Sequence, residues 1–281
     1  MEEYYFLFGL AFLWTIFATI QDLRYREVAN WLNFSLITFA LAYRAFYSIY
    51  TKDIHFFLLG LCGTIIFVGL AYALYYGKAF AGGDAKLLMG YGAILPYSSY
   101  VGIFILSLTF LFVLLTAGTI YSLIYSVFIV AKNKNKFNRE FKKRLTKNKV
   151  LAITILLAFI ISIIISLFYS RTILLSVILI FPLVWVYTKS LEVCMIKLYP
   201  PEKLTEGDWL EQDVKIGKKT IKKSVHGLSK SEIELIKKYK KKVLIKEGIP
   251  FVPAFLIALL IMVFFFVILE LSLDSWFLSL F

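Results

Sequence analysis

Residues 100–130 read YVGIFILSLTFLFVLLTAGTIYSLIYSVFIV and contain no charged side chain. A helix needs about 20 predominantly apolar residues to cross a bilayer, and this run exceeds that length. The apolar residues are continuous rather than alternating with polar ones, which excludes the strand pattern of an outer-membrane barrel. The stretch therefore predicts a transmembrane helix.

Similar runs recur along the chain of 281 residues, of which 60% are hydrophobic. A soluble domain has about 45–50% apolar residues, so this excess does not fit inside one ordinary core. We therefore expect an all-α fold, a polytopic transmembrane helix bundle of about eight segments. These segments are expected at residues 4–20, 31–50, 55–76, 84–95, 100–130, 150–169, 172–198 and 250–269. The fourth is short, and we expect it to stop partway through the bilayer or to lie inside the bundle.

The net charge of +13 is concentrated in residues 132–149 and 199–248, between apolar runs. Membrane topology explains this distribution, and no nucleic-acid partner is expected. Under the positive-inside rule both basic stretches lie in the cytoplasm and both chain termini lie outside. We expect the basic stretches to lie near the anionic headgroups of the lipid bilayer.

The stretch 199–248 is the one loop long enough for a soluble subdomain. Within it, residues 229–246 are predicted to form an amphipathic helix. Ser229 would cap this helix with Glu232 three residues later, and Ile233, Ile236 and Val243 would form its apolar face.

Two aspartates stand at the ends of predicted membrane segments, where a charge is costly and so suggests function. Asp22 follows the first segment, and Asp84 opens the fourth, directly after Gly82 and Gly83. The charge topology places both on the cytoplasmic side, which is the condition for a carboxylate dyad. Such a pair shares a proton, so one carboxyl acts as general base on water while the other donates to a scissile carbonyl. Glycines beside it would allow close approach of a substrate strand and unusual backbone dihedrals.

Each aspartate also has a structural interpretation. Asp84 fits the N-cap of a helix, a position that Asp favours. Asp22 fits a loop carboxylate paired with Arg24 or Arg26. Neither interpretation explains why both acids fall on the same side of the membrane.

At these residues the sequence resembles the archaeal preflagellin/prepilin peptidases within the type IV prepilin peptidase family, which are GxGD-type intramembrane aspartyl proteases. The stretch DLRYREVANWL at residues 22–32 is similar to the family's first aspartate motif. The stretch GGDAKLLMG at 82–90 resembles its GxGDxKLL segment, with Ala81 in place of the first glycine. A third, weaker similarity is GIPFVPAF at 248–255.

The resemblance implies an aspartic endopeptidase that removes the short basic leader peptide of type IV pilin-like or archaellin-like precursors at the cytoplasmic face. It assigns the catalytic roles to Asp22 and Asp84, with Gly82, Gly83 and Lys86 in supporting positions. No metal or organic cofactor is implied. Bacterial members also methylate the new N-terminus and carry a cysteine-rich zinc insert; here only Cys62 and Cys194 are present, so methyltransferase activity is not expected.

Under this interpretation residues 1–131 hold the catalytic membrane helices. They are followed by a basic loop at 132–149, membrane helices at 150–198, a cytoplasmic subdomain at 199–248 and the last membrane helix with its tail at 249–281. The main alternative is an ion- or proton-coupled transporter that uses Asp22 and Asp84 as ligands. A catalytically silent scaffold of a secretion or pilus machine is a further alternative.

Overall fold

The computed structural model describes residues 2–147, 149–166, 168–169, 173–217, 219–224 and 227–268. The chain divides into two compact units. The first comprises Met1–Leu123 with Ile249–Phe281, and the second comprises Ile124–Gly248. The last predicted membrane segment thus folds with the N-terminal ones.

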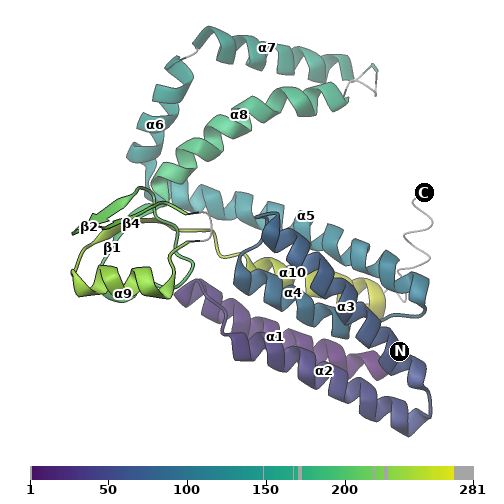
Figure 1. Cartoon of the computed structure of the whole chain (residues 1–281). Helices are drawn as coiled ribbons and strands as arrows, with labels where there is room; N and C mark the ends of the chain where they lie inside the picture. Colours follow the sequence, from purple (N-terminus) through teal and green to yellow (C-terminus); the bar gives the residue numbers. More distant parts are fainter. Residues whose placement is uncertain are drawn as a thin grey trace. The chain divides into compact units, whose positions relative to one another are not determined.

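The first unit is a helix bundle (Figure 1). Its helices are α1 (Glu2–Tyr25), α2 (Asn30–Thr51), α3 (Ile54–Tyr76), α4 (Gly82–Ile94), the first part of α5 (Tyr100–Lys132) and α10 (Val252–Val263), which continues as a π-helical stretch over Phe264–Ile268. Three helices of the described chain are long and apolar enough to cross a membrane: Glu3–Tyr25, Ile54–Tyr76 and Tyr100–Lys132. The apolar helices confirm a polytopic membrane fold, while the number of spans stays a prediction.

Helix α4 forms the centre of this bundle. It packs against α1, α2 and α3, and its residues Leu88, Tyr91 and Ile94 are all fully buried. Close approach to its neighbours depends on glycines, because a Cβ on Gly92 would lie 2.7 Å from the carbonyl oxygen of Gly63 on α3. The short fourth segment of the sequence therefore lies inside the bundle, one of the two expected placements.

A buried arginine explains how α4 ends inside an apolar bundle. Arg44 on α2 is 0% exposed, and its Nε and Nη2 donate to the carbonyl oxygens of Ala93 and Leu95, each at 2.7 Å. Its Nη1 donates to the carbonyl of Phe56 at 3.0 Å. The last carbonyls of a helix lack intrahelical donors and carry its negative dipole end, so a guanidinium satisfies them and complements their charge.

The second unit holds the remainder of α5 and three further helices: α6 (Lys134–Lys147), α7 (Lys149–Ser166) and α8 (Ile173–Cys194). The basic stretch predicted as a loop is thus largely helix α6, which is anchored by Phe137 against Leu191 and Cys194 of α8. Residues 170–172, at the predicted turn between two membrane segments, lie outside the described part of the chain.

A small α/β insert follows α8. It contains β1 (Ile196–Tyr199), a 3-10 turn (Pro201–Lys203), β2 (Val214–Ile216), β3 (Lys219–Ile221), α9 (Lys230–Lys238) and β4 (Val243–Lys246). Strand β1 pairs antiparallel with β4, and β2 pairs antiparallel with β3. The predicted membrane segment at 172–198 is therefore too long, since its last residues form a strand.

The helix predicted over residues 229–246 is confirmed only in its first half. Ser229 accepts a hydrogen bond from the backbone N–H of Glu232, and α9 ends at Lys238. Lys240 then adopts a positive φ of 47°, which breaks the helix, and Val243–Lys246 pairs with β1. The alternation of buried Val243 and Ile245 with half-buried neighbours is the period-two pattern of a strand.

Candidate functional site

Asp22 lies in the last turns of α1 and is 7% exposed. Its Oδ2 accepts a hydrogen bond at 3.0 Å from the backbone N–H of Val252, the first residue of α10. The first N–H groups of a helix have no intrahelical acceptor and form its positive dipole end, so they stabilise a carboxylate. The charge of Arg26, one of its two expected partners, also acts on this group.

Asp84 is the third residue of α4 and is half-buried. Its Oδ2 accepts a hydrogen bond at 3.3 Å from the backbone N–H of Ala81, which precedes the helix. The N-cap is Ala81, so the interpretation of Asp84 as the N-cap is wrong; Asp84 instead accepts from the N-cap backbone as the third residue of the helix. The charge of Asp22 acts on Asp84, so the two carboxyl groups lie within electrostatic range of each other.

An aromatic cluster holds the starts of α4 and α10 together. The ring of Phe80, just before α4, lies 5.2 Å from that of Phe251 and 6.0 Å from that of Phe255. Because Phe251 immediately precedes Val252, this packing places the N–H that binds Asp22 close to the beginning of the helix that carries Asp84.

The loop between α1 and α2 is tied to both aspartate-bearing helices. The side chain of Gln21 accepts a hydrogen bond from the backbone N–H of Ala29 at 3.0 Å. Lys86 Nζ on α4 donates to Oδ1 of Asn30, the first residue of α2, at 2.7 Å, so this bond links α2 to α4.

Gly82 and Gly83 begin α4 with helical backbone, and neither has a positive φ. The expectation of unusual dihedrals at these glycines is therefore wrong. A Cβ at Gly83 would make only ordinary contacts, the nearest at 3.6 Å from the backbone of Val28. Their small size matters only for whatever approaches the helix start from outside.

No role for the backbone of Val252 was predicted from the sequence. The signal was present in the Pro-Phe-Val-Pro stretch that starts the last helix, because proline favours the first turn of a helix and so marks where free N–H groups begin. Among the described residues, no three His, Cys, Asp or Glu side chains gather at the aspartate pair or elsewhere.

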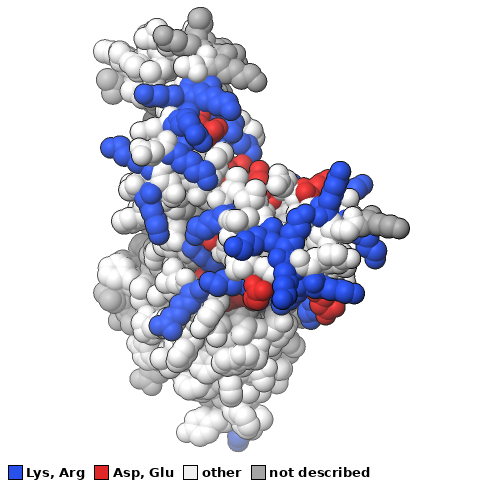
Figure 2. Space-filling view, turned by 90° about the vertical axis from the view of Figure 1, so that its left-hand side faces the viewer, with Lys and Arg blue, Asp and Glu red and all other residues white. Residues whose placement is uncertain are grey.

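The second unit carries a basic surface. Figure 2 shows one face of the molecule on which Lys and Arg side chains are more abundant than Asp and Glu. Among the described residues, the exposed lysines of the insert are Lys197, Lys203, Lys215, Lys219, Lys222, Lys223, Lys230, Lys237, Lys238, Lys240, Lys241 and Lys242.

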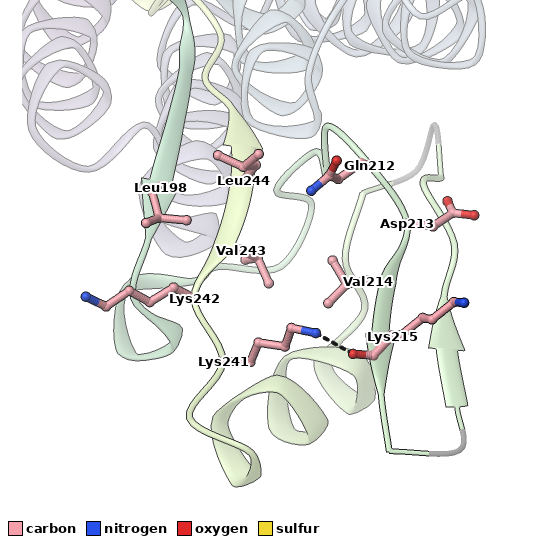
Figure 3. A pocket seen from close by; sticks show the side chains of 9 residues that line it. All are labelled: Leu198, Gln212, Asp213, Val214, Lys215, Lys241, Lys242, Val243 and Leu244. Atoms are coloured by element: carbon pink, nitrogen blue, oxygen red, sulfur yellow. Dashed lines mark hydrogen bonds between the residues drawn. The ribbon is translucent and has the colours of Figure 1, made fainter.

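A groove of about 240 Å³ lies within the insert, between β4 and the start of β2 (Figure 3). Lys215, Lys241 and Lys242 line it together with apolar side chains such as Val214 and Val243. Lys241 Nζ donates to the carbonyl oxygen of Lys215 at 2.5 Å, which bridges the two sides.

The fold defines a class: a helical membrane protein with one aspartate in the last turns of α1 and another in the first turn of α4. Residues 9–131 match the model of the type IV leader peptidase family. The resemblance read from the two aspartate motifs is thereby confirmed for this part of the chain.

Two curated relatives are preflagellin peptidases, from Methanocaldococcus jannaschii and from Methanococcus maripaludis. Each is 31% identical over 81 residues, which is 29% of this chain and 34% and 35% of the respective relatives. The match thus spans about a third of the length of these relatives. No solved structure matches the chain.

Proposed function

We propose that this protein is a membrane-embedded aspartyl endopeptidase. It removes the short basic leader peptide of type IV pilin-like or archaellin-like precursors at the cytoplasmic face of the membrane. The observation that carries this proposal is packing that links Asp22 and Asp84, which are 62 residues apart in sequence: Asp22 binds the first N–H of α10, and Phe251 before that helix packs on Phe80 before α4. Both aspartates lie inside the stretch that matches leader peptidases.

The reaction needs one ionised and one protonated carboxyl group. The ionised carboxylate takes a proton from a water molecule, whose oxygen attacks the scissile carbonyl, while the protonated carboxyl donates its proton to the carbonyl oxygen. The tetrahedral intermediate then collapses, and the leaving amine takes a proton from the dyad. No metal or organic cofactor takes part, and no methyl transfer follows.

Both aspartates are held by backbone N–H groups, and for Asp22 that of Phe251 acts beside that of Val252. The described hydrogen bonds engage Oδ2 of Asp22 with Val252 and Oδ2 of Asp84 with Ala81. Because these donors are backbone N–H groups, they fix the carboxyl groups without supplying a competing acid.

The basic surface of the insert and of α6 is proposed to lie against anionic lipid headgroups. Helix α8 ends at Cys194 and β1 begins at Ile196, so the insert follows an apolar helix with almost no linker. A lysine near an anionic membrane surface contributes about 1 kcal/mol, and several of them act together.

The test is cleavage of a co-expressed pilin-like or archaellin-like precursor in membranes, read as a mobility shift. Wild type is compared with Asp22→Asn and Asp84→Asn, which keep side-chain size and the capacity to accept a hydrogen bond. We expect wild type to cut and both variants, inserted at wild-type levels, to leave the precursor intact. Cleavage by either variant at the wild-type rate would disprove the dyad and favour the transporter alternative.

A further inference from the structure

A side-chain hydrogen bond joins α1 to α4 deep in the bundle. The hydroxyl groups of Thr15 and Tyr91 lie 2.7 Å apart, and both residues are 0% exposed. The Tyr91 hydroxyl also lies 3.5 Å from the carbonyl oxygen of Phe255 on α10. Among the described hydrogen bonds, the Thr15–Tyr91 bond is the one that connects helix α1 with helix α4.

The positions of these two residues relate them to the aspartates. Thr15 precedes Asp22 by seven residues, and Tyr91 follows Asp84 by seven residues. Seven residues are about two helical turns and about 10 Å, so each member of the pair lies on the same helix face as an aspartate. The bond therefore holds the two aspartate-bearing faces toward each other.

The tyrosine hydroxyl is held firmly enough to act as a fixed point. The Tyr91 ring stacks on that of Phe110 of α5 with 4.8 Å between centroids, and it lies 5.7 Å from the ring of Phe255. With the ring enclosed on two sides, the position of its hydroxyl is set by packing. The hydrogen bond between Tyr91 and Thr15 therefore fixes α1 relative to this hydroxyl.

The other described link between the two aspartates runs through apolar packing, because the rings of Phe80, Phe251 and Phe255 join the start of α4 to the start of α10. Asp22 is bound to the N-terminus of α10, and Asp84 is bound to the backbone just before its own helix. Apolar side chains between α1 and α4 tolerate small slides or rotations of one helix against the other, because dispersion contacts have little directionality. A short hydrogen bond between the helices weakens when one helix slides or rotates, because its strength depends on distance and angle.

We propose that Thr15 and Tyr91 are positioning residues that set the spacing of the Asp22 and Asp84 carboxyl groups. They touch neither water nor substrate and act through the register of α1 against α4. The kinetic part of this inference rests on the proposed protease function, whereas the geometric part does not.

The kinetic experiment compares Thr15→Val, Tyr91→Phe and the double variant with wild type in the precursor-cleavage assay. Each single variant is expected to lower kcat about tenfold with KM nearly unchanged, because small misplacement of reacting groups slows chemistry without weakening binding. The double variant is expected to be no slower than the slower single variant, since both changes remove one shared bond.

The matched control is Tyr4→Phe. Tyr4 is also a buried tyrosine of the same unit, and its hydroxyl donates to the carbonyl of Tyr97 at 2.9 Å, beyond the other end of α4 from Asp84. This variant is expected to keep wild-type kcat. An equal loss of kcat in Tyr4→Phe, or wild-type kcat in Tyr91→Phe, would overturn the inference.

A cross-linking experiment measures the geometry without catalysis. Asp22→Cys and Asp84→Cys are combined in a chain in which Cys62 and Cys194 are replaced by Ala, and a short bifunctional thiol reagent is added to membranes. We expect a high yield of linked product by mass spectrometry, and a several-fold lower yield once Tyr91→Phe is added. An unchanged yield overturns the inference. By contrast, cleavage by the Asp→Asn variants would overturn only the proposed function.

Discussion

Replacing the buried arginine of α2 tests how the central helix is held. In Arg44→Met the side-chain volume is largely kept while three donors are lost, two to the end of α4 and one to Phe56. A hydrogen bond from a charged group contributes about 1.5–3 kcal/mol, so the three together contribute about 5 kcal/mol or more. The cost of burying the charge, several kcal/mol, offsets part of this sum.

The net expectation is that Arg44→Met lowers the free energy of unfolding by about 3 kcal/mol, or about a hundredfold in the unfolding equilibrium. The assay is denaturant unfolding of the purified protein in detergent micelles. Gly60→Ala is a second route to the same loss, because its Cβ would lie 2.2 Å from Arg44 Cδ and displace the guanidinium. Arg24→Met, at an exposed position, is the control and should change stability by less than about 0.5 kcal/mol.

A free energy of unfolding of Arg44→Met within about 1 kcal/mol of wild type would refute the stabilising role of Arg44, since its hydrogen bonds would then only offset the cost of burying the charge. An equal loss of stability in Arg24→Met would also refute it, because a general effect of removing positive charge would then explain both.

Val252→Pro removes the N–H that binds Asp22 and should slow precursor cleavage about tenfold. Val252→Ala keeps that N–H and should cleave at nearly the wild-type rate. Equal cleavage rates of the two variants would contradict the role of this hydrogen bond. In the insert, burial raises the pKa of the Asp208 carboxyl despite hydrogen bonds from Thr205 that oppose the shift. The folded insert therefore holds this proton to higher pH than the unfolded chain, so its stability falls as pH rises from the unfolded pKa through the folded one. Asp208→Asn should remove that slope, measured by pulse proteolysis in urea at pH 4 to 8; an unchanged slope would count against it. Finally, the double variant Lys241→Glu with Lys242→Glu should cleave at the wild-type rate in detergent. On vesicles that contain phosphatidylglycerol it should be slower than on vesicles of pure phosphatidylcholine. Equal slowing on the two kinds of vesicle would disprove contact of these lysines with anionic lipid.

Local sequence patterns predicted the helices that interactions within the same short stretch stabilise. The apolar runs fix the helices of the first unit, because in a bilayer the backbone must satisfy its own hydrogen bonds. The cap at Ser229 marks the true start of α9, since a capping side chain acts only on the adjacent turn.

The predictions that differ from the structure concern segments whose conformation depends on contacts with other segments. The charged residues of α6 gave no membrane signal and were predicted as a loop, yet Phe137 anchors them as a helix on α8. The end of α9 was missed because Val243, seven residues after Ile236, continues the helical stripe as well as it fits a strand. Only the presence of β1 as a partner selects the strand.

Hydropathy and motif spacing are properties of short stretches, so they were enough to predict a helical membrane protein and to single out Asp22 and Asp84. The contacts that hold these two residues became apparent only from the packing of the helices. Val252 reaches Asp22 across 230 residues of chain, and Tyr91 reaches Thr15 across 76. Contacts between such distant segments depend on how whole helices pack, and no local pattern in a single sequence records that packing.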